Sequence, residues 1–163
     1  MKNYVPSVKH GNGGIMVWGC IGYEGVGKLT VVDGIIDSIK YTRILSTCLD
    51  ESIDQLGISD VAIFQQDNAT VHTSKYTKEF FEINGINTME WPAQSPDLNP
   101  IENVWAYIEV ELKKHVIKNK SQLAEKINEI WNNIPPSYIK KLNMSIPKRI
   151  EMVIRNKGGH IPY

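Results

Sequence analysis

The stretch WPAQSPDLNPIENVW, residues 91–105, decides how this chain folds. Three prolines stiffen it, and the last of them, Pro100, suits the first position of a helix because proline has no N–H to donate there. Asn99, directly before it, is a preferred N-cap residue. The stretch therefore predicts a stiff loop that leads into a helix, with Glu102 in the first helical turn.

A second carboxylate lies upstream, with 34 residues between the two. Asp67 closes the run VAIFQQD, residues 61–67, whose apolar start is typical of a buried strand. Open α/β sheets place functional groups at strand ends and helix N-termini, so Asp67 and Glu102 are expected to meet. Carboxylates suit Mg²⁺ and Mn²⁺, and two such ions can promote phosphodiester cleavage. The pair predicts a metal-dependent site for this chemistry.

Each acid also has a purely structural interpretation. An aspartate at the end of a strand is commonly a turn residue. Glu102 falls at the third helical position, where its side chain could accept a hydrogen bond from the backbone N–H of Asn99 in a capping box. Spacing alone leaves both interpretations open.

The remaining pattern alternates strands and helices. Strands are predicted over residues 13–21, 28–33, 61–66 and 86–91, and helices over 39–56, 74–83, 100–116 and 122–133, with a last helical stretch from 135 onward. The first two strands are expected to form a hairpin. The order predicts one α/β domain over residues 1–163, a mixed sheet flanked by helices. No apolar run approaches the roughly 20 residues of a membrane span, and no secretory or other targeting signal is visible at the N-terminus.

The formal net charge of zero hides an asymmetry. Residues 1–112 carry 7 Lys and Arg against 15 Asp and Glu, whereas residues 113–163 carry 11 against 3. Such a basic region can be a solvated helix face, or it can hold nucleic-acid phosphates. An acidic metal site beside a basic surface favours DNA as the substrate. The candidate DNA contacts are Lys113, Lys114, Lys118, Lys120, Lys148 and Arg149.

The runs QQDNA, residues 65–69, and WPAQSPDLNPIENVW closely resemble the catalytic core of mariner-superfamily transposases, in the branch whose last acid is glutamate. Residues 8–21 and 146–163 resemble the beginning and the end of the same core. The resemblance implies a ribonuclease H-like fold and cut-and-paste DNA transposition with two Mg²⁺ or Mn²⁺ ions. It also implies transposon ends and target DNA as partners, a homodimer or pairing with a full-length transposase, and a nuclear location.

The resemblance assigns roles by position. Asp67 matches the second acid of the family's triad, and Glu102 the third, so both are expected to be catalytic metal ligands. The expected supporting residues are Asn68, His72, Asp97 and Asn99. His72 is expected to contact DNA, to position the site or to act as a helix cap, and the loop residues Asp97 and Asn99 to fix the helix of Glu102. Thr70 stands where the family commonly has proline.

The resemblance also implies an acid that this sequence does not supply. The family's first acid lies on a strand upstream of residues 13–21, and residues 1–12 contain no Asp or Glu. We therefore expect the chain to lack that acid, its strand and a helix-turn-helix DNA-binding domain, and to be inactive alone. Asp33 and Asp97 are not expected to substitute. Without the strand, residues 13–21 and 61–66 must pair directly or leave open edges. The alternative function is a catalytically silent fragment that binds DNA or a transposase.

Overall fold

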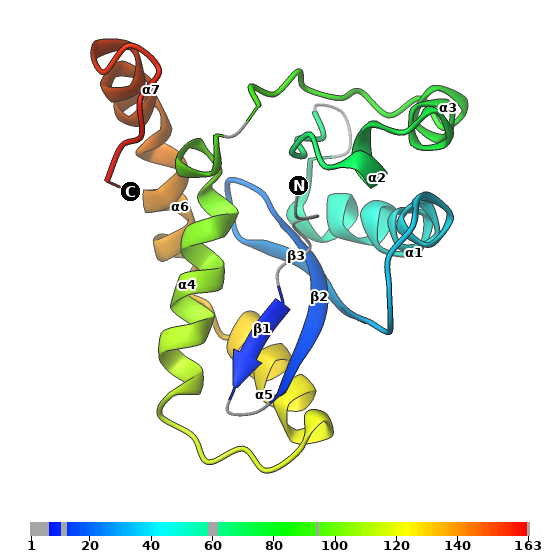
Figure 1. The fold of residues 1–163 in the computed structure, drawn as a ribbon, viewed down its shortest axis with the longest axis vertical. Helices are drawn as coiled ribbons and strands as arrows, with labels where there is room; N and C mark the ends of the chain where they lie inside the picture. The colour runs from blue at the N-terminus through cyan, green and yellow to red at the C-terminus, as the bar shows by residue number, and fades with distance from the viewer. Residues whose placement is uncertain (1–6, 11–12, 59–61, 94, 163) are drawn as a thin grey trace.

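The computed structural model describes residues 7–10, 13–58, 62–93 and 95–162, with a sheet between two groups of helices (Figure 1). The sheet is antiparallel and has the order β1-β2-β3. Its strands are β1 (Ser7–His10), β2 (Gly13–Ile21) and β3 (Val26–Val32). β2 pairs with β3 from Met16 to Ile21, so the predicted hairpin is confirmed.

The helices of the described residues flank this sheet. They are α1 (Ser38–Leu56), α2 (Thr70–Thr73), α3 (Lys75–Ile83), α4 (Pro100–Leu112), α5 (Lys120–Asn132), α6 (Pro136–Met144) and α7 (Ile146–Arg155), with a 3₁₀ turn, η1 (Pro96–Leu98), before α4. Figure 1 shows α1, α2 and α3 on one side of the sheet and α4, α6 and α7 on the other. None of these helices is both long and apolar enough to cross a membrane.

β2 contributes to two apolar cores, because successive side chains of a strand point to opposite faces. Ile15 and Val17 pack in a cluster with residues of α4, α5 and α6. Trp18 packs in a second cluster with residues of β3, α1 and α3. The sheet is thus covered on both faces, as the mixed α/β pattern predicts.

A buried tryptophan on α5 joins the helices to the sheet. The Trp131 ring stacks on Trp105 of α4 at 5.4 Å between centroids, and its Nε1–H donates to the backbone oxygen of Gly27 over 2.8 Å. A Cβ atom on Gly19 would lie 2.9 Å from the Trp131 ring. Residue 19 must therefore be glycine for this ring to approach β2 so closely.

The predicted strands 61–66 and 86–91 are not regular strands, and Val61 lies outside the described residues. The two segments meet at one parallel bridge, Phe64 with Thr88. The Phe64 N–H donates to the Asn87 oxygen over 2.8 Å, and the Met89 N–H donates to the Phe64 oxygen over 2.9 Å. No hydrogen bond found among the described residues connects this segment to β2. Of the two predicted outcomes, the segments do not pair directly, and the edge of β2 is open only in part: β1 covers residues 13–16, and residues 17–21 pair with β3 alone among the described residues.

Helix boundaries follow local chemistry, with some departures. Asp37 Oδ1 accepts the Lys40 N–H over 2.8 Å at the start of α1, and Gly57 ends this helix at φ 66°. α4 ends at Leu112 instead of the predicted residue 116, and α5 begins at Lys120 instead of the predicted residue 122, because Asn119 caps it. The C-terminal helical stretch is divided into α6 and α7, because Pro147 has no N–H to continue the α6 ladder.

Candidate active site

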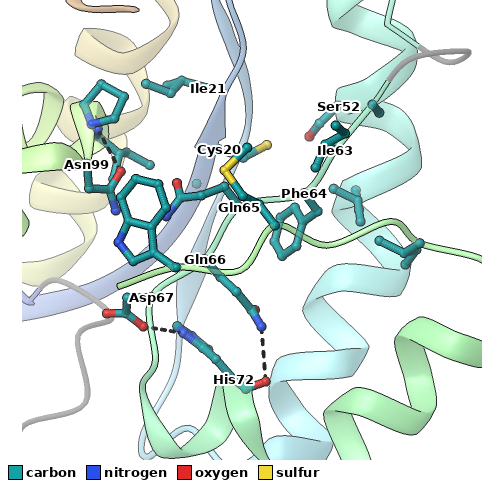
Figure 2. A pocket seen from close by; sticks show the side chains of 18 of the residues that line it. Cys20, Ile21, Ser52, Ile63, Phe64, Gln65, Gln66, Asp67, His72 and Asn99 are labelled. Carbon is teal, nitrogen blue, oxygen red and sulfur yellow. Dashed lines mark hydrogen bonds and ion pairs between the residues drawn. The ribbon is translucent and has the colours of Figure 1, made fainter. Parts of the chain in front are cut away.

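A cleft of about 830 Å³ opens between β2, α1, residues 62–67 and the start of α4. Asp67 and Glu102 both line it, as do apolar residues of α1 and β2. Figure 2 shows this cleft from close by, with Asp67 and His72 facing one another. The two acids predicted from separate motifs therefore share one cavity.

Asp67 is held by one of its two carboxylate oxygens. Oδ1 accepts the Ala69 N–H over 3.0 Å and lies 2.6 Å from Nδ1 of His72 (Figure 2). Because an ionised carboxylate can only accept, His72 donates from Nδ1. Burial alone would raise the pKa of Asp67, but the hydrogen bonds from His72 and Ala69 outweigh burial and hold that pKa below its usual value. Oδ2 makes no hydrogen bond among the described residues, so an ionised oxygen is left for a ligand.

His72 is itself held by buried neighbours. Its side chain is 8% exposed, and its ring lies against that of Tyr41 at 4.4 Å between centroids. The Gln66 amide donates to the His72 backbone oxygen over 3.1 Å and accepts the Tyr41 hydroxyl over 2.6 Å. Burial and the charge of Asp67 raise the pKa of Tyr41, so its hydroxyl remains a neutral donor. His72 is thus held in contact with Asp67 Oδ1, the geometry that a positioning role would require.

Asn68 connects the two motifs of the sequence. Its Nδ2 donates to the backbone oxygen of Trp91 over 2.7 Å, which fixes the start of the proline-rich loop beside Asp67. The next residues, Ala69 and Thr70, are the N-cap and first residue of α2, a helix that the sequence pattern did not predict.

Glu102 enters the site from the first turn of α4. Asn99 Oδ1 accepts the Ile101 N–H over 3.3 Å, which confirms Asn99 as the N-cap. The Asn99 N–H donates to the Pro96 oxygen over 2.9 Å, so the capping-box interpretation of Glu102 is not realised. Burial, and then the negative charge of Asp67, raise the pKa of Glu102. The two carboxylates are thus within electrostatic reach of each other.

Asp97 faces away from this pair and contacts the C-terminal tail. Its Oδ2 accepts the Ile161 N–H over 2.9 Å and lies 3.1 Å from Nδ1 of His160. Its carboxylate is therefore not available as a third acid beside Asp67, as the sequence led us to expect. Asp33 follows the end of β3 and is exposed.

Five of the six candidate DNA contacts are exposed. Lys113, Lys114, Lys118 and Lys120 lie between and at the facing ends of α4 and α5, and Lys148 lies on α7. Arg149 departs from the prediction: it is 1% exposed, and its guanidinium donates to the Asp97 backbone oxygen over 2.9 Å and to Ser145 Oγ over 2.8 Å. The helical turn of α7 places Arg149 on the inner face, so it is a packing residue and not part of the surface.

Comparison with known proteins identifies the family of this chain. The model of a family described as DDE superfamily endonuclease matches residues 3–124. The Tcb2 transposase of Caenorhabditis briggsae is 37% identical over 98% of this chain, and the Tc1 transposase of Caenorhabditis elegans is 36% identical over 99%. The chain spans 58% and 59% of the length of these two relatives.

Solved structures match the fold at low sequence identity. The catalytic domain of the Mos1 mariner transposase superposes with a TM-score of 0.81 at 17% identity, over 91% of this chain and 76% of that one. The Mos1 paired-end complex with the left transposon end gives 0.83 at 18% identity, over 99% of this chain and 52% of that one.

These matches define the fold as that of the ribonuclease H-like catalytic domain of mariner transposases. The chain belongs to the DDE superfamily endonucleases and is a transposase catalytic domain of the Tc1/mariner type, as its two sequence motifs predicted.

Proposed function

We propose that this chain is the catalytic core of a cut-and-paste DNA transposase, in which Asp67 and Glu102 hold divalent metal at the site of strand cleavage and strand transfer. The observation that carries this proposal is the convergence of the two acids on one cleft, where the charge of Asp67 raises the pKa of Glu102. A carboxylate whose ionisation is disfavoured by a neighbouring carboxylate is a favourable ligand for a cation, which would relieve that repulsion.

The donor set fits Mg²⁺ or Mn²⁺. Asp67 would offer Oδ2, and Glu102 a carboxylate with no hydrogen bond among the described residues. When bound, the metal would neutralise both charges and polarise a water or phosphate oxygen. The protein's own residues hold this arrangement: His72 and the Ala69 N–H keep Asp67 ionised and oriented, and the Asn99 cap fixes the helix turn of Glu102.

We also propose that the chain is inactive alone because a third acid is missing. Within the described residues, no group of three or more His, Cys, Asp or Glu side chains could hold a metal. Residues 17–21 of β2 line the cleft, and among the described residues they pair with β3 and not with β1. Gln65 also lines the cleft, and its buried Nε2 has no hydrogen-bond partner among the described residues, which supports a missing neighbour at this wall.

DNA is the proposed partner, as transposon end and as target. The exposed lysines at 113–120 would contact phosphates, and the related Mos1 protein has been solved in paired-end complexes. Function on paired ends would require a homodimer or pairing with a longer transposase. The alternative, a silent DNA-binding fragment, would use the same lysines without metal.

Manganese binding, followed by electron paramagnetic resonance at pH 7, tests the metal site. We expect Asp67→Asn and Glu102→Gln each to weaken binding at least ~10-fold, in the range for lost metal-site interactions. Asp33→Asn, an exposed control, should leave the Kd unchanged. Unaltered binding in both site variants would exclude the metal site and favour the silent fragment.

A plasmid-nicking assay with Mn²⁺ tests the proposed inactivity. We expect no nicking by the isolated chain. Nicking that disappears in Asp67→Asn would show that two acids suffice and that no third acid is required.

A further inference from the structure

The C-terminal tail folds back from α7 onto the loop that carries Glu102. α7 ends at Arg155 with Asn156 as its C-cap, and in the turn that follows Gly158 has φ 84° and its N–H donates to the Val153 oxygen over 2.9 Å. The Asn156 side chain then donates to the His160 backbone oxygen over 2.8 Å. The turn is therefore built from specific hydrogen bonds that direct residues 160–161 toward η1.

The tail meets the loop at Asp97. The side chain of Asp97 is 9% exposed, and its Oδ2 accepts the Ile161 N–H and faces His160. The Ile161 side chain is also buried, at 6% exposure. Burial alone would raise the pKa of Asp97, but the Ile161 N–H and His160 lower it overall, so the buried carboxylate stays ionised.

A buried arginine holds the same turn from the other side. Arg149 Nη1 donates to the backbone oxygen of Asp97 over 2.9 Å, while its Nε donates to Ser145 Oγ over 2.8 Å. The tail thus binds the Asp97 side chain, and α7 binds the Asp97 backbone. The hydrogen-bond partners are 64 residues apart in sequence for Ile161 and 52 for Arg149.

The path from Asp97 to Glu102 is short and hydrogen-bonded. The Asn99 N–H donates to the Pro96 oxygen across η1, and the Glu102 N–H donates to the Asn99 oxygen over 3.2 Å. On the preceding side, the Ser95 hydroxyl donates to the Ala93 oxygen and the Ser95 oxygen accepts the Leu98 N–H, so both hydrogen bonds stay within the loop and η1. Among the described residues, the hydrogen bonds found between η1 and distant parts of the chain come from α7 and the tail.

We propose that residues 158–161, acting through Asp97, are a positioning element for Glu102. The tail holds η1, η1 sets the first turn of α4, and that turn places the Glu102 carboxylate in the cleft. This inference rests on the proposed function, since the position of Glu102 matters to a metal only if Glu102 binds one. Asp97, His160 and Ile161 are positioning residues here and do not touch the metal or DNA.

Amide hydrogen exchange of the full chain tests the positioning directly and without metal. We expect Asp97→Ala to accelerate exchange at residues 98–102 by at least ~10-fold, as for loss of local protection. Removal of residues 160–163 should have the same effect. Asp97→Asn, which keeps an oxygen for the Ile161 N–H, should restore most protection. Amides of β2 and α5 should be unchanged, and Asp33→Ala serves as the exposed control.

Manganese affinity supplies the second readout. Asp97→Ala should weaken Mn²⁺ binding, and adding it to Glu102→Gln should weaken binding no further, because both changes then remove the same ligand. Unchanged amide exchange at residues 98–102 in Asp97→Ala would overturn the inference. So would losses of Mn²⁺ affinity that add fully when Asp97→Ala and Glu102→Gln are combined. If Glu102→Gln alone leaves Mn²⁺ binding intact, the proposed metal site fails instead, and exchange at residues 98–102 still decides whether the tail fixes the helix.

Discussion

Asp67 and Glu102 are chemically similar side chains in contrasting surroundings. Hydrogen bonds from His72 and the Ala69 N–H lower the pKa of Asp67, whereas burial and the charge of Asp67 raise the pKa of Glu102. The first acid is therefore ionised and oriented before any ligand binds. Ionisation of the Glu102 carboxyl, in contrast, becomes favourable when a bound cation offsets its burial and the charge of Asp67.

His72 is predicted to control metal affinity through Asp67. His72→Phe retains an aromatic ring against Tyr41 but removes the N–H that holds Asp67 Oδ1. We expect Mn²⁺ affinity to fall by about 10-fold, the lower end of the range for losing a hydrogen-bond partner of a metal ligand. Titration by electron paramagnetic resonance measures this, with the exposed His115→Phe as control. Equal affinity in the two variants would mean that His72 does not orient Asp67.

Glu102 is predicted to destabilise the metal-free fold at neutral pH. A carboxyl whose pKa is raised by folding contributes stability below its ordinary pKa, and that contribution is lost as the pH rises through the folded pKa. Glu102→Gln cannot ionise, so at pH 7 in EDTA its Tm should exceed that of the parent by about 2 °C. The difference should shrink by pH 3.5. A lower Tm at pH 7 would show that Glu102 is instead a stabilising helix residue.

At the scale of the elements, the short helix α2 begins at Thr70, where the family commonly has proline. We therefore ask what proline would do at this position. Thr70 is the first residue of α2, where a proline lacks only an N–H that the helix leaves unpaired. Ala69 has φ −58° and ψ 147°, the extended conformation that a residue before proline prefers. Thr70→Pro should therefore stabilise the fold by about 0.5–1 kcal/mol, mainly by restricting the unfolded chain.

Urea unfolding of the two proteins measures this difference. Thr73→Pro, in the last turn of α2, is the control and should destabilise, because the Thr73 N–H donates to the Ala69 oxygen over 3.0 Å. A lower urea midpoint for Thr70→Pro would indicate that the backbone at residue 70 cannot adopt the angles of proline.

Local signals explain which elements could be predicted from the sequence. The helix that begins at Pro100 follows from Asn99 and Pro100 themselves, and the end of α1 follows from Gly57. A strand, in contrast, forms only where a neighbouring strand supplies hydrogen bonds along its length. Residues 62–66 make a single bridge, between Phe64 and Thr88, and so do not form a regular strand.

The same distinction applies to the site residues. Asp67 and Glu102 lie in motifs that can be read locally, and so does the cap Asn99. Tyr41 was missed because its link to Gln66 spans 25 residues and has no sequence pattern. Arg149 was predicted to lie on the surface because arginine is charged and sits in a basic region. The sequence pattern does not indicate its burial against Asp97, which is 52 residues away.

At the scale of the whole molecule, the close approach of α5 to the sheet depends on Gly19. A Cβ at this position would lie 2.9 Å from the Trp131 ring, which is fully buried and stacked on Trp105. Gly19→Ala should therefore destabilise the fold by about 1–3 kcal/mol, the typical cost of overpacking a core. Gly25→Ala, with open space around its added methyl, should change stability far less. Urea midpoints measure both, and equal midpoints would show that the Trp131 ring moves aside freely.

The charge asymmetry between the two parts of the chain leads to a prediction on DNA binding. Lys113, Lys114, Lys118 and Lys120 are exposed, although Lys114 also pairs with Glu111 at 2.6 Å. If these lysines contact phosphates, changing all four to Gln should weaken duplex binding and flatten its salt dependence. The slope of log K against log salt should fall by up to about 3–4, since each phosphate contact contributes about 0.9.

Fluorescence anisotropy with a labelled duplex at several salt concentrations measures that slope. Changing Lys28, Lys75, Lys78 and Lys140 to Gln removes the same total charge elsewhere, and so separates a local contact from the effect of net charge. Equal slopes for the two variants would place the DNA on another face. Because the four lysines lie at the far end of α4 from Glu102, a larger loss of slope in their variant would place DNA at this end of the helix.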